Sequence, residues 1–401
     1  MCKTLSLGSD LRNHIPKFSK FFASGILLLF LPFVAFSDSL PEEEYEPVVT
    51  PPFHDYYRYT TSTGSGFRIP NTTKVWVGGD VMFNWGVRDA MKSEDPLFPF
   101  RGFISLLYNM DYRMLNLETP ILRKTPTVDK LKSYVFYGET KDLRVLSMLQ
   151  IDGVFLGNNH TMDLGDSGLK DTLQSLEDYK ISFAGAGMNE EESLKPLIFK
   201  KDNWEYRTYS FSDIGETRLF ATQKNPGAAY FRVPLAERLA KRSKPNQVNL
   251  LSVHWGVEYS PEPTDVQRKT AKYLIGAGYQ VILGHHPHVP QGIEVFPKGV
   301  AIYSLGNFLF GSKNMYLKHN VSVVLHFLNG KIVCVEVIPV FGKHQSVSGD
   351  QYFSPLSAVE SEEFLREYAL LCKNLGTELV ISGGRGYVFL AKELKASVKP
   401  Y

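Results

Sequence analysis

Six apolar, strand-like runs in this chain each end in a polar residue that has glycine or asparagine beside it. Helical patterns separate several of these runs, and this alternation predicts an α/β sheet core with added antiparallel strands. Parallel strands bring their C-terminal ends to one edge of a sheet, so we expect the six polar ends to converge there. The six ends are Gly79-Asp80, Asn116-Leu117-Glu118, Gly157-Asn158-Asn159-His160, Val253-His254-Trp255-Gly256, Gly284-His285-His286-Pro287-His288 and Ser304-Leu305-Gly306-Asn307.

The spacing of apolar residues also predicts the individual elements. Strands are expected over 74–83, 113–118, 153–158, 181–185, 248–255, 279–285, 301–310 and 386–391, with several short strands within 196–233. Helices are expected near 97–109, 139–150, 166–179, 264–277 and 359–374. We expect Asp166 or Ser167 to cap the helix over 166–179, with Asp163 shaping the turn before it. Asn329-Gly330 predicts a hairpin within 321–340.

The N-terminus has the composition of a targeting segment. Basic residues precede an apolar run over 21–36, and Ala35-Phe36-Ser37 fits a cleavage site. We therefore expect a cleaved signal peptide over 1–37, with an uncleaved membrane anchor as the alternative. Pro, Glu, Tyr, Ser and Thr dominate residues 38–73, which predicts a flexible linker. The protein would then be exported, to the periplasm or the cell surface.

Composition sets few limits on partners. Of the 401 residues, 43% are hydrophobic and 21% charged, which allows a sizeable globular core. The net charge of +2 argues neither for nor against a polyanionic partner. We expect a main domain over 74–341 and a C-terminal extension over 342–401 that packs on it. Cys334 and Cys372 form no cysteine cluster, so any metal site would use His, Asp, Glu and Asn side chains.

Three of the ten histidines lie within four positions at a strand end, namely His285, His286 and His288. Neutral imidazole is a common metal ligand, so this clustering favours a site over a structural role. The candidate metal ligands are Asp80, Glu118, Asn159, His254, His286 and His288. This mixed nitrogen and oxygen set fits one or two divalent ions such as Mn, Fe or Zn. His160 follows Asn159 and would act on substrate as a general acid or hydrogen-bond donor.

Each of these residues also has a purely structural interpretation. Asp80 follows two glycines and could be a turn residue. Asn158-Asn159 could be no more than a turn at the exit of a strand. His254 could be a core histidine with satisfied hydrogen bonds. Glu258, Arg268 and Lys272 form a candidate substrate-binding rim, for which a solvated helix face is the alternative.

Several long stretches resemble the CapA family of poly-γ-glutamate capsule biosynthesis proteins in wording, spacing and order. They are VGGDVMF (77–83), LNLETPI (115–121), LGNNHTMDLGDSGLKDTLQSL (156–176), FAGAG (183–187), VHWGVEY (253–259), LIGAGYQVILGHHPHVPQGIEV (274–295) and IYSLGNFLF (302–310). Together they span about residues 74–312. The fold of that family is similar to calcineurin-like metallophosphoesterases. The resemblance therefore implies a layered α/β/β/α sandwich with mixed sheets flanked by helices.

The metallophosphoesterase pattern can be carried over residue by residue. Asp80 matches the aspartate of its Asp-x-His motif, but Met82 occupies the histidine position. The bridging carboxylate resembles Glu118, and its Gly-Asn-His segment resembles Asn159 and His160. The strand-end histidine resembles His254, and the closing Gly-His-x-His resembles His286-Pro287-His288 or, less cleanly, begins at His285. Asp80, Glu118 and His160 would then be catalytic. Met82 removes one ligand from the first metal position.

The resemblance implies a role in making, exporting, anchoring or trimming an anionic extracellular polymer such as poly-γ-glutamate. We expect a metal-dependent hydrolase or transferase that works beside membrane-bound synthase or export subunits and without nucleic acid. One alternative is a non-catalytic polymer-binding or scaffold subunit, which the Met82 departure favours. The other is a secreted metallophosphatase.

Overall fold

The computed structural model describes residues 67, 69, 71–84, 86–91, 101–123, 135–310, 319–341, 354–391 and 394–395. The predicted signal peptide over 1–37 and most of the predicted linker lie outside the described residues. None of the described helices is long and apolar enough to cross a membrane. The first strand begins at Thr73, one residue before the predicted domain start.

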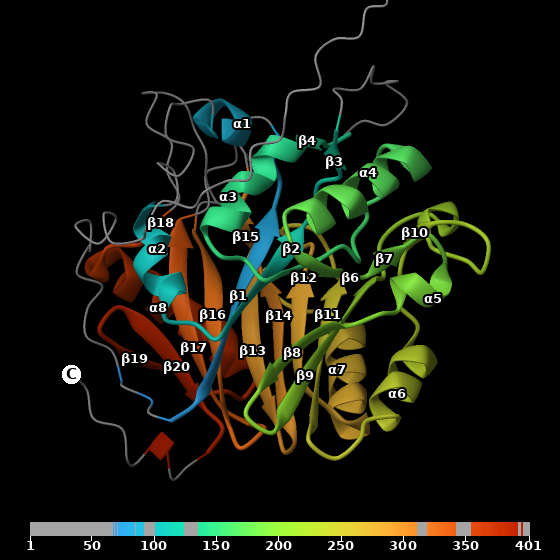
Figure 1. The fold of residues 1–401 in the computed structure, drawn as a ribbon. Helices are drawn as coiled ribbons and strands as arrows, with labels where there is room; N and C mark the ends of the chain where they lie inside the picture. The colour runs from blue at the N-terminus through green and yellow to red at the C-terminus, as the bar shows by residue number, and fades with distance from the viewer. Residues whose placement is uncertain are drawn as a thin grey trace, which may run out of the picture. The chain divides into compact units, whose positions relative to one another are not determined.

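Two mixed β-sheets lie face to face in the described part of the chain (Figure 1). The first sheet has the order β19-β20-β17-β16-β1-β2-β5-β6, with β15 beside β1 and β18 beside β17. Its strands are β1 (Thr73–Val81), β2 (Tyr112–Leu117), β5 (Gly153–Phe155), β6 (Ser182–Ala184), β15 (Asn307–Leu309), β16 (His319–Leu328), β17 (Lys331–Phe341), β18 (Ser354–Pro355), β19 (Val380–Ser382) and β20 (Arg385–Phe389). Strands β1, β2, β5 and β6 run parallel, and β16, β17, β20 and β19 continue the sheet with antiparallel pairing.

The second sheet has the order β13-β14-β12-β11-β9-β8. Its strands are β8 (Leu197–Lys201), β9 (Trp204–Ser212), β11 (Gln247–His254), β12 (Tyr279–His285), β13 (Pro290–Phe296) and β14 (Gly299–Leu305). The four inner strands are parallel, and β8 and β13 pair antiparallel at the two edges. The remaining short strands are β3 (Ile121–Leu122) with β4 (Gly138–Glu139), and β7 (Ala186–Gly187) with β10 (Gly227–Ala228).

Helices cover the outer face of each sheet (Figure 1). Those against the first sheet include α2 (Arg101–Tyr108), α3 (Leu143–Met148) and α4 (Gly165–Asp178), and those against the second are α6 (Val233–Lys241) and α7 (Asp265–Ala277). The other helical segments are α1 (Gly86–Met91), η3 (Thr140–Asp142), α5 (Glu190–Ser193), η4 (Thr217–Leu219) and α8 (Ala358–Asn374). Within β1, Val75 and Val77 pack between the sheets, whereas Trp76 packs toward the helices. The expected α/β/β/α layering with mixed sheets is confirmed.

Most of the expected elements form, but the predicted strand over 301–310 is divided into β14 and β15, which belong to different sheets. β12 has the predicted bounds, and the hairpin turn holds Asn329 at φ 49° and Gly330 at φ 68°, as a type I′ turn requires. α6 and β13 were not predicted. The predicted cap at Asp166 or Ser167 is wrong, because α4 begins at Gly165 and Leu164 takes the cap position without a side-chain hydrogen bond.

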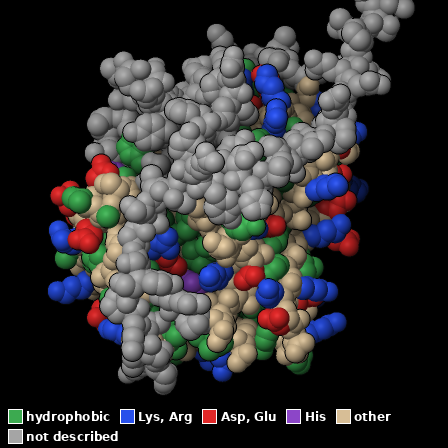
Figure 2. Space-filling view, turned by 60° about the vertical axis from the view of Figure 1, so that its left-hand side comes forward, with side chains coloured by type: hydrophobic (Ala, Val, Ile, Leu, Met, Phe, Trp, Pro, Cys, Tyr) green, Lys and Arg blue, Asp and Glu red, His purple; other side chains and the backbone are tan. Residues whose placement is uncertain are grey.

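The C-terminal segment is part of the fold. It adds β18, β19 and β20 to the first sheet, while α8 contributes Leu365 and Tyr368 to the core between the sheets. The Tyr368 hydroxyl donates to the Gln291 carbonyl at 2.9 Å, which fastens α8 to β13. Cys334 and Cys372 are both buried and free. On the face seen in Figure 2, basic and acidic side chains are interspersed among the described residues.

The strand ends that carry the candidate residues converge, but they do so from two sheets. Asp80 and Glu118 follow β1 and β2 of the first sheet, whereas His254 and His285 end β11 and β12 of the second. The expectation of a single sheet edge is therefore wrong. A backbone hydrogen bond of 2.9 Å from the Asp80 amide to the Gly306 carbonyl joins the two edges.

Candidate metal centre

Asp80 lies fully buried near the end of β1. The pairing of β1 with β15 and with β2 shifts register at this residue. Gly79 allows the β1 backbone to lie this close to Gly306, because a Cβ atom at residue 79 would collide with the Gly306 carbonyl oxygen. Oδ1 of Asp80 accepts from Asn116 Nδ2 at 2.8 Å and from His285 Nδ1 at 3.0 Å. Burial alone would raise the pKa of Asp80, but the His285 hydrogen bond and the surrounding imidazoles hold that pKa below its ordinary value.

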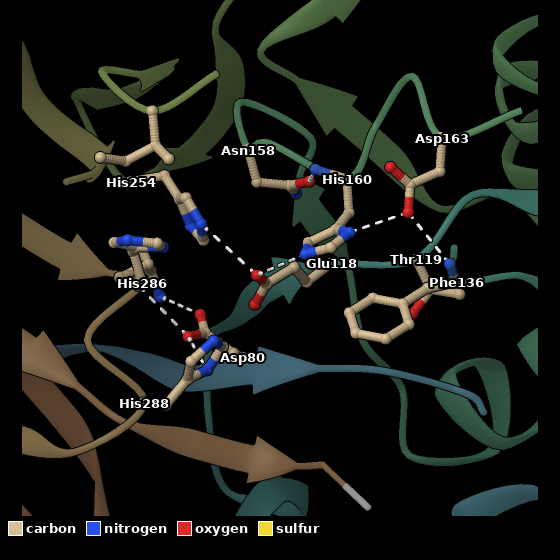
Figure 3. A network of polar contacts seen from close by, with 12 residues as sticks. Asp80, Glu118, Thr119, Phe136, Asn158, His160, Asp163, His254, His286 and His288 are labelled. Atoms are coloured by element: carbon tan, nitrogen blue, oxygen red, sulfur yellow. Dashed lines mark hydrogen bonds and ion pairs between the residues drawn. The ribbon is translucent and has the colours of Figure 1, made fainter. Parts of the chain in front are cut away.

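Glu118 is also fully buried, and among the described residues neither of its carboxylate oxygens has a hydrogen-bond partner. Two imidazole nitrogens lie close to its Oε1, with His254 Nε2 at 3.4 Å and His160 Nε2 at 3.9 Å (Figure 3). Burial, followed by repulsion from Asp80, raises the pKa of Glu118 to about 8. A buried carboxyl group without a hydrogen-bond partner costs about 1–3 kcal/mol or more of folding stability. This cost indicates that Glu118 has a functional role and not only a packing role.

Two buried histidines face Glu118. Both ring nitrogens of His254 and Nδ1 of His286 have no hydrogen-bond partner among the described residues. Burial lowers the pKa of His286 to about 2 and the pKa of His254 well below its ordinary value, so both rings are neutral. One ligand atom from each of Glu118, His254 and His286 lies within 4.8 Å of the others. Unpartnered carboxylate oxygens and neutral imidazoles in one buried cluster fit a divalent cation.

The other two histidines of the run, His288 and His285, each contact a neighbouring side chain through Nδ1. His288 Nδ1 lies 3.0 Å from Asn307 Oδ1. An amide oxygen only accepts, so Nδ1 of His288 carries the proton and Nε2 keeps its lone pair for a ligand. His285 contacts Asp80 through Nδ1, and its Nε2 is a buried atom without a partner. His286 and His288 have φ values of 97° and 58°, a left-handed backbone that non-glycine residues adopt at a cost.

His160 is oriented from the opposite side. Its Nδ1 lies 2.8 Å from Asp163 Oδ2, which also accepts from the Phe136 amide at 3.0 Å (Figure 3). The Phe136 ring lies against the imidazole at 4.2 Å between centroids. Sequence reasoning assigned Asp163 only to the turn before α4. The spacing of a carboxylate three residues after a histidine in a turn was the signal that could have identified it.

The two neighbouring asparagines differ in their contacts. Asn158 holds the turn, because its Nδ2 donates to Leu117 O at 2.9 Å and its Oδ1 accepts from the His160 amide at 3.2 Å. Oδ1 of Asn159 is buried and has no partner among the described residues. An orphaned amide oxygen suits a metal ligand, and that role for Asn159 stays a prediction.

Met82 is fully buried in a small apolar cluster with Phe136 and Phe310. Its sulfur accepts a hydrogen bond from the Asn84 amide at 3.0 Å. These two phenylalanines also lie against the rings of His160 and His288. Met82 therefore forms part of an apolar wall beside the cluster and supplies no nitrogen ligand.

The three predicted substrate-binding residues have different surroundings. Glu258 is exposed, yet one of its carboxylate oxygens lies within 4.8 Å of ring nitrogens of His286 and His288. Arg268 donates to both carboxylate oxygens of Glu294 on β13, at 2.8 and 3.1 Å. Lys272 is exposed one turn further along α7. A role in substrate binding stays a prediction for all three.

Known proteins resemble this chain over its central part. It is 28% identical to the capsule biosynthesis protein CapA of Bacillus anthracis over 65% of the chain and 66% of that protein, just under two thirds of its length. It is 27% identical to the PGA biosynthesis protein CapA of Bacillus subtilis over 65% of the chain and 70% of that protein. A solved phosphatase of Mycoplasma pneumoniae aligns over 68% of this chain and 88% of its own, with 16% identity and a TM-score of 0.39.

A family model matches the part of the chain that contains the second sheet, the parallel strands of the first sheet and the buried cluster. The match runs over residues 74–312, from the start of β1 to just beyond β15, and so covers more than half of the 401 residues. This chain therefore belongs to the bacterial capsule synthesis protein family PGA_cap.

Proposed function

We propose that this protein is an exported, metal-dependent hydrolase or transferase that acts in the biosynthesis of a poly-γ-glutamate type capsule polymer. One observation carries the proposal: Glu118, His254 and His286 are buried together with ligand atoms that lack hydrogen-bond partners. Membership in a capsule synthesis family and similarity to two CapA proteins support the capsule role. We further propose that residues 1–37 direct export to the periplasm or cell surface, where membrane-bound synthase or export subunits would be its partners.

The chemistry of the ligand set suits Mn, Fe or Zn in one or two positions. A divalent ion held there would polarise a substrate oxygen and lower the pKa of a water molecule. Glu118, His254, His286 and His288 would hold it, with Asp80 and the Asn159 amide oxygen as further ligands.

His160 would act on the substrate beside this cluster. Its Nδ1 contacts Asp163, and its Nε2 lies on the Glu118 side of the ring, where it would hold or deliver a proton. A proton at Nε2 can then pass to the oxygen or nitrogen that leaves when a polymer or phosphoester bond breaks. Phe136 covers one side of the ring and restricts its rotation.

Elemental analysis and turnover assays on the purified full chain test the proposal together. We expect at least one equivalent of Mn, Fe or Zn, and turnover of poly-γ-glutamate or of an aryl phosphate that chelation abolishes. His254→Ala should lose both the metal and the turnover. If the protein holds no transition metal after growth with metal supplied, the metal-enzyme proposal fails. Release of phosphate from simple aryl phosphates alone, with the polymer untouched, would favour a secreted metallophosphatase.

A second candidate function is a non-catalytic subunit that binds or scaffolds the polymer. The position of Met82 favours it, because an apolar cluster occupies the place where the family pattern has a ligand histidine. This candidate predicts that the metal-loaded protein binds poly-γ-glutamate but turns over neither the polymer nor phosphoesters. Equilibrium binding with a labelled polymer, run beside the turnover assay, separates the two candidates.

A further inference from the structure

The loop that follows β11 is fastened to the histidine run. The Trp255 amide donates to the His285 carbonyl at 3.0 Å, and the Tyr259 amide donates to the Pro287 carbonyl at 2.8 Å. Gly256 permits the sharp turn between them, with φ 94° and with Gln267 where a side chain would lie. Glu258 lies between these two backbone hydrogen bonds, so its backbone position is fixed relative to His286 and His288.

A buried side chain holds the far end of the same loop. Gln291, fully buried on β13, donates through Nε2 to the Ser260 carbonyl at 2.8 Å. The Tyr259 ring lies 6.1 Å from the ring of His288. Hydrogen bonds at Trp255, Tyr259 and Ser260 therefore hold the loop in place. Because the loop is already ordered, Glu258 can act as a ligand at a small entropic cost.

The described residues offer three sets of ligand atoms. Two are buried, namely Glu118 with His254 and His286, and Asp80 with Glu118 and His288, and the third contains Glu258. One oxygen of Glu258 and one ring nitrogen from each of His286 and His288 lie within 4.8 Å of one another. Nδ1 of His286 is a buried atom without a partner, and Nε2 of His288 keeps its lone pair because Nδ1 is bonded to Asn307. Glu258 itself is exposed, so this set lies at the rim, outside the buried set of Glu118, His254 and His286.

We propose that Glu258 is a ligand of an outer divalent cation, which it holds with His288 at the rim of the metal centre, while the single lone pair of the neutral His286 ring serves the inner cation. The proposal rests on the metal centre of the proposed function and assigns a second position within it. Met82 supplies no nitrogen at the family's first metal position, so the ligand that the outer cation needs comes instead from the loop after β11. The exposed carboxylate makes the outer position the weaker of the two, because water competes for it.

The two positions can be separated by mutation. His254 belongs only to the buried set with Glu118 and His286, and Glu258 belongs only to the outer set, whereas His286 and His288 each appear in two sets. Substitution of His254 therefore addresses the inner cation, and substitution of Glu258 addresses the outer one. Glu262 lies in the same segment, is also exposed, and appears in none of the three sets, so Glu262→Gln is the matched control.

The test is equilibrium dialysis of the metal-free full chain against Mn²⁺, with bound metal measured by elemental analysis. We expect two equivalents in the wild-type protein and in Glu262→Gln, with distinct affinities. Glu258→Gln should weaken the second equivalent by about tenfold or more and leave the first unchanged, as expected for loss of a charged ligand. His254→Ala should weaken the first equivalent. Thermal unfolding of Glu258→Gln should match the wild type, because the side chain is exposed.

The outcomes distinguish this proposal from the one on which it rests. If Glu258→Gln binds two equivalents with wild-type affinities, the role of Glu258 is wrong and the metal centre stands. The same conclusion follows if the wild-type protein binds a single equivalent that Glu258→Gln retains. If the wild-type protein binds no Mn²⁺ and no Zn²⁺, the metal centre fails and Glu258 has no cation to hold.

Discussion

Asp163 Oδ2 lies 2.8 Å from Nδ1 of His160, three residues earlier in the same turn. The carboxylate is buried and also accepts the Phe136 amide, so it is fixed from two directions. A histidine held in this way keeps one orientation and one tautomer, which a proton-transfer group needs. The pair lies at the end of β5, while the predicted ligands around it come from both sheets.

Asp163→Asn should lower kcat by about a hundredfold on whichever substrate the wild type turns over, because the ring loses its anionic partner. Metal content should stay at the wild-type level, since Asp163 belongs to none of the candidate ligand sets. Asp166→Asn, an exposed change in the first turn of α4, is the matched control and should leave kcat unchanged. A wild-type kcat in Asp163→Asn would show that His160 does not transfer a proton. Steady-state kinetics with elemental analysis of each variant make the comparison.

Gly79→Ala should displace Asp80 and reduce metal binding. The added Cβ would collide with the Gly306 carbonyl, which accepts the Asp80 amide, so β1 and the turn before β15 must separate. Backbone collisions in a packed core cost about 1–3 kcal/mol of unfolding free energy. Gly276→Ala is the matched control: it lies in α7 with no atom within 4 Å of the added Cβ, and should stabilise the helix by about 0.5–1 kcal/mol. Denaturant unfolding and metal content check both variants, and equal metal content in Gly79→Ala and wild type would contradict the prediction.

Local patterns were enough to predict the strand ends, because each signal lies within one short segment. β12 and the Asn329-Gly330 hairpin depend only on neighbouring residues, and both form as expected. The division of the strands between two sheets could not be predicted, because it depends on pairing between segments far apart in the chain. Family resemblance, and not residue spacing, gave the layered architecture.

The omissions also have physical reasons. β13 contains Pro290 and Gly292, which are typical of turns, but Gly292 lies where the α8 backbone at Leu371 leaves no room for a Cβ. Glu258 lies close to the histidines because the Tyr259 amide donates a hydrogen bond to the Pro287 carbonyl. This contact joins residues far apart in the chain, so it could not be predicted from the sequence. In contrast, His254 and His286 could be identified as ligand candidates because His254 ends an apolar strand and His286 directly follows one.

Met82→Leu should leave metal content and turnover at wild-type levels. The side chain packs with Phe136 and Phe310, so an apolar side chain of similar volume fills its place at a cost below about 1.5 kcal/mol. Met82→Ala should cost about 2–5 kcal/mol through the cavity it leaves. Thermal unfolding and elemental analysis measure both effects. A loss of metal in Met82→Leu, at unchanged stability, would instead make the thioether a ligand.

The metal-free protein should lose stability as the pH rises from 7 to 8. The folded-state pKa of Glu118 is raised to about 8, above its value in the unfolded chain, so the folded protein binds more protons in this window. The unfolding free energy then falls with pH, by up to about 1 kcal/mol per unit. The depressed pKa values of His254 and His286 act in the opposite direction, but only below about pH 6.5, where the unfolded chain takes up their protons.

Glu118→Gln isolates this effect, because the amide mimics the protonated carboxyl group and does not titrate. Denaturant unfolding of the chelator-treated wild type at pH 7.0, 7.5 and 8.0 should show the decline, and Glu118→Gln should not. Metal binding should strengthen over the same window in the wild type, since the ligand must lose its proton. A flat wild-type profile, or an equal decline in both proteins, would mean that Glu118 is already ionised at pH 7 in the folded, metal-free chain.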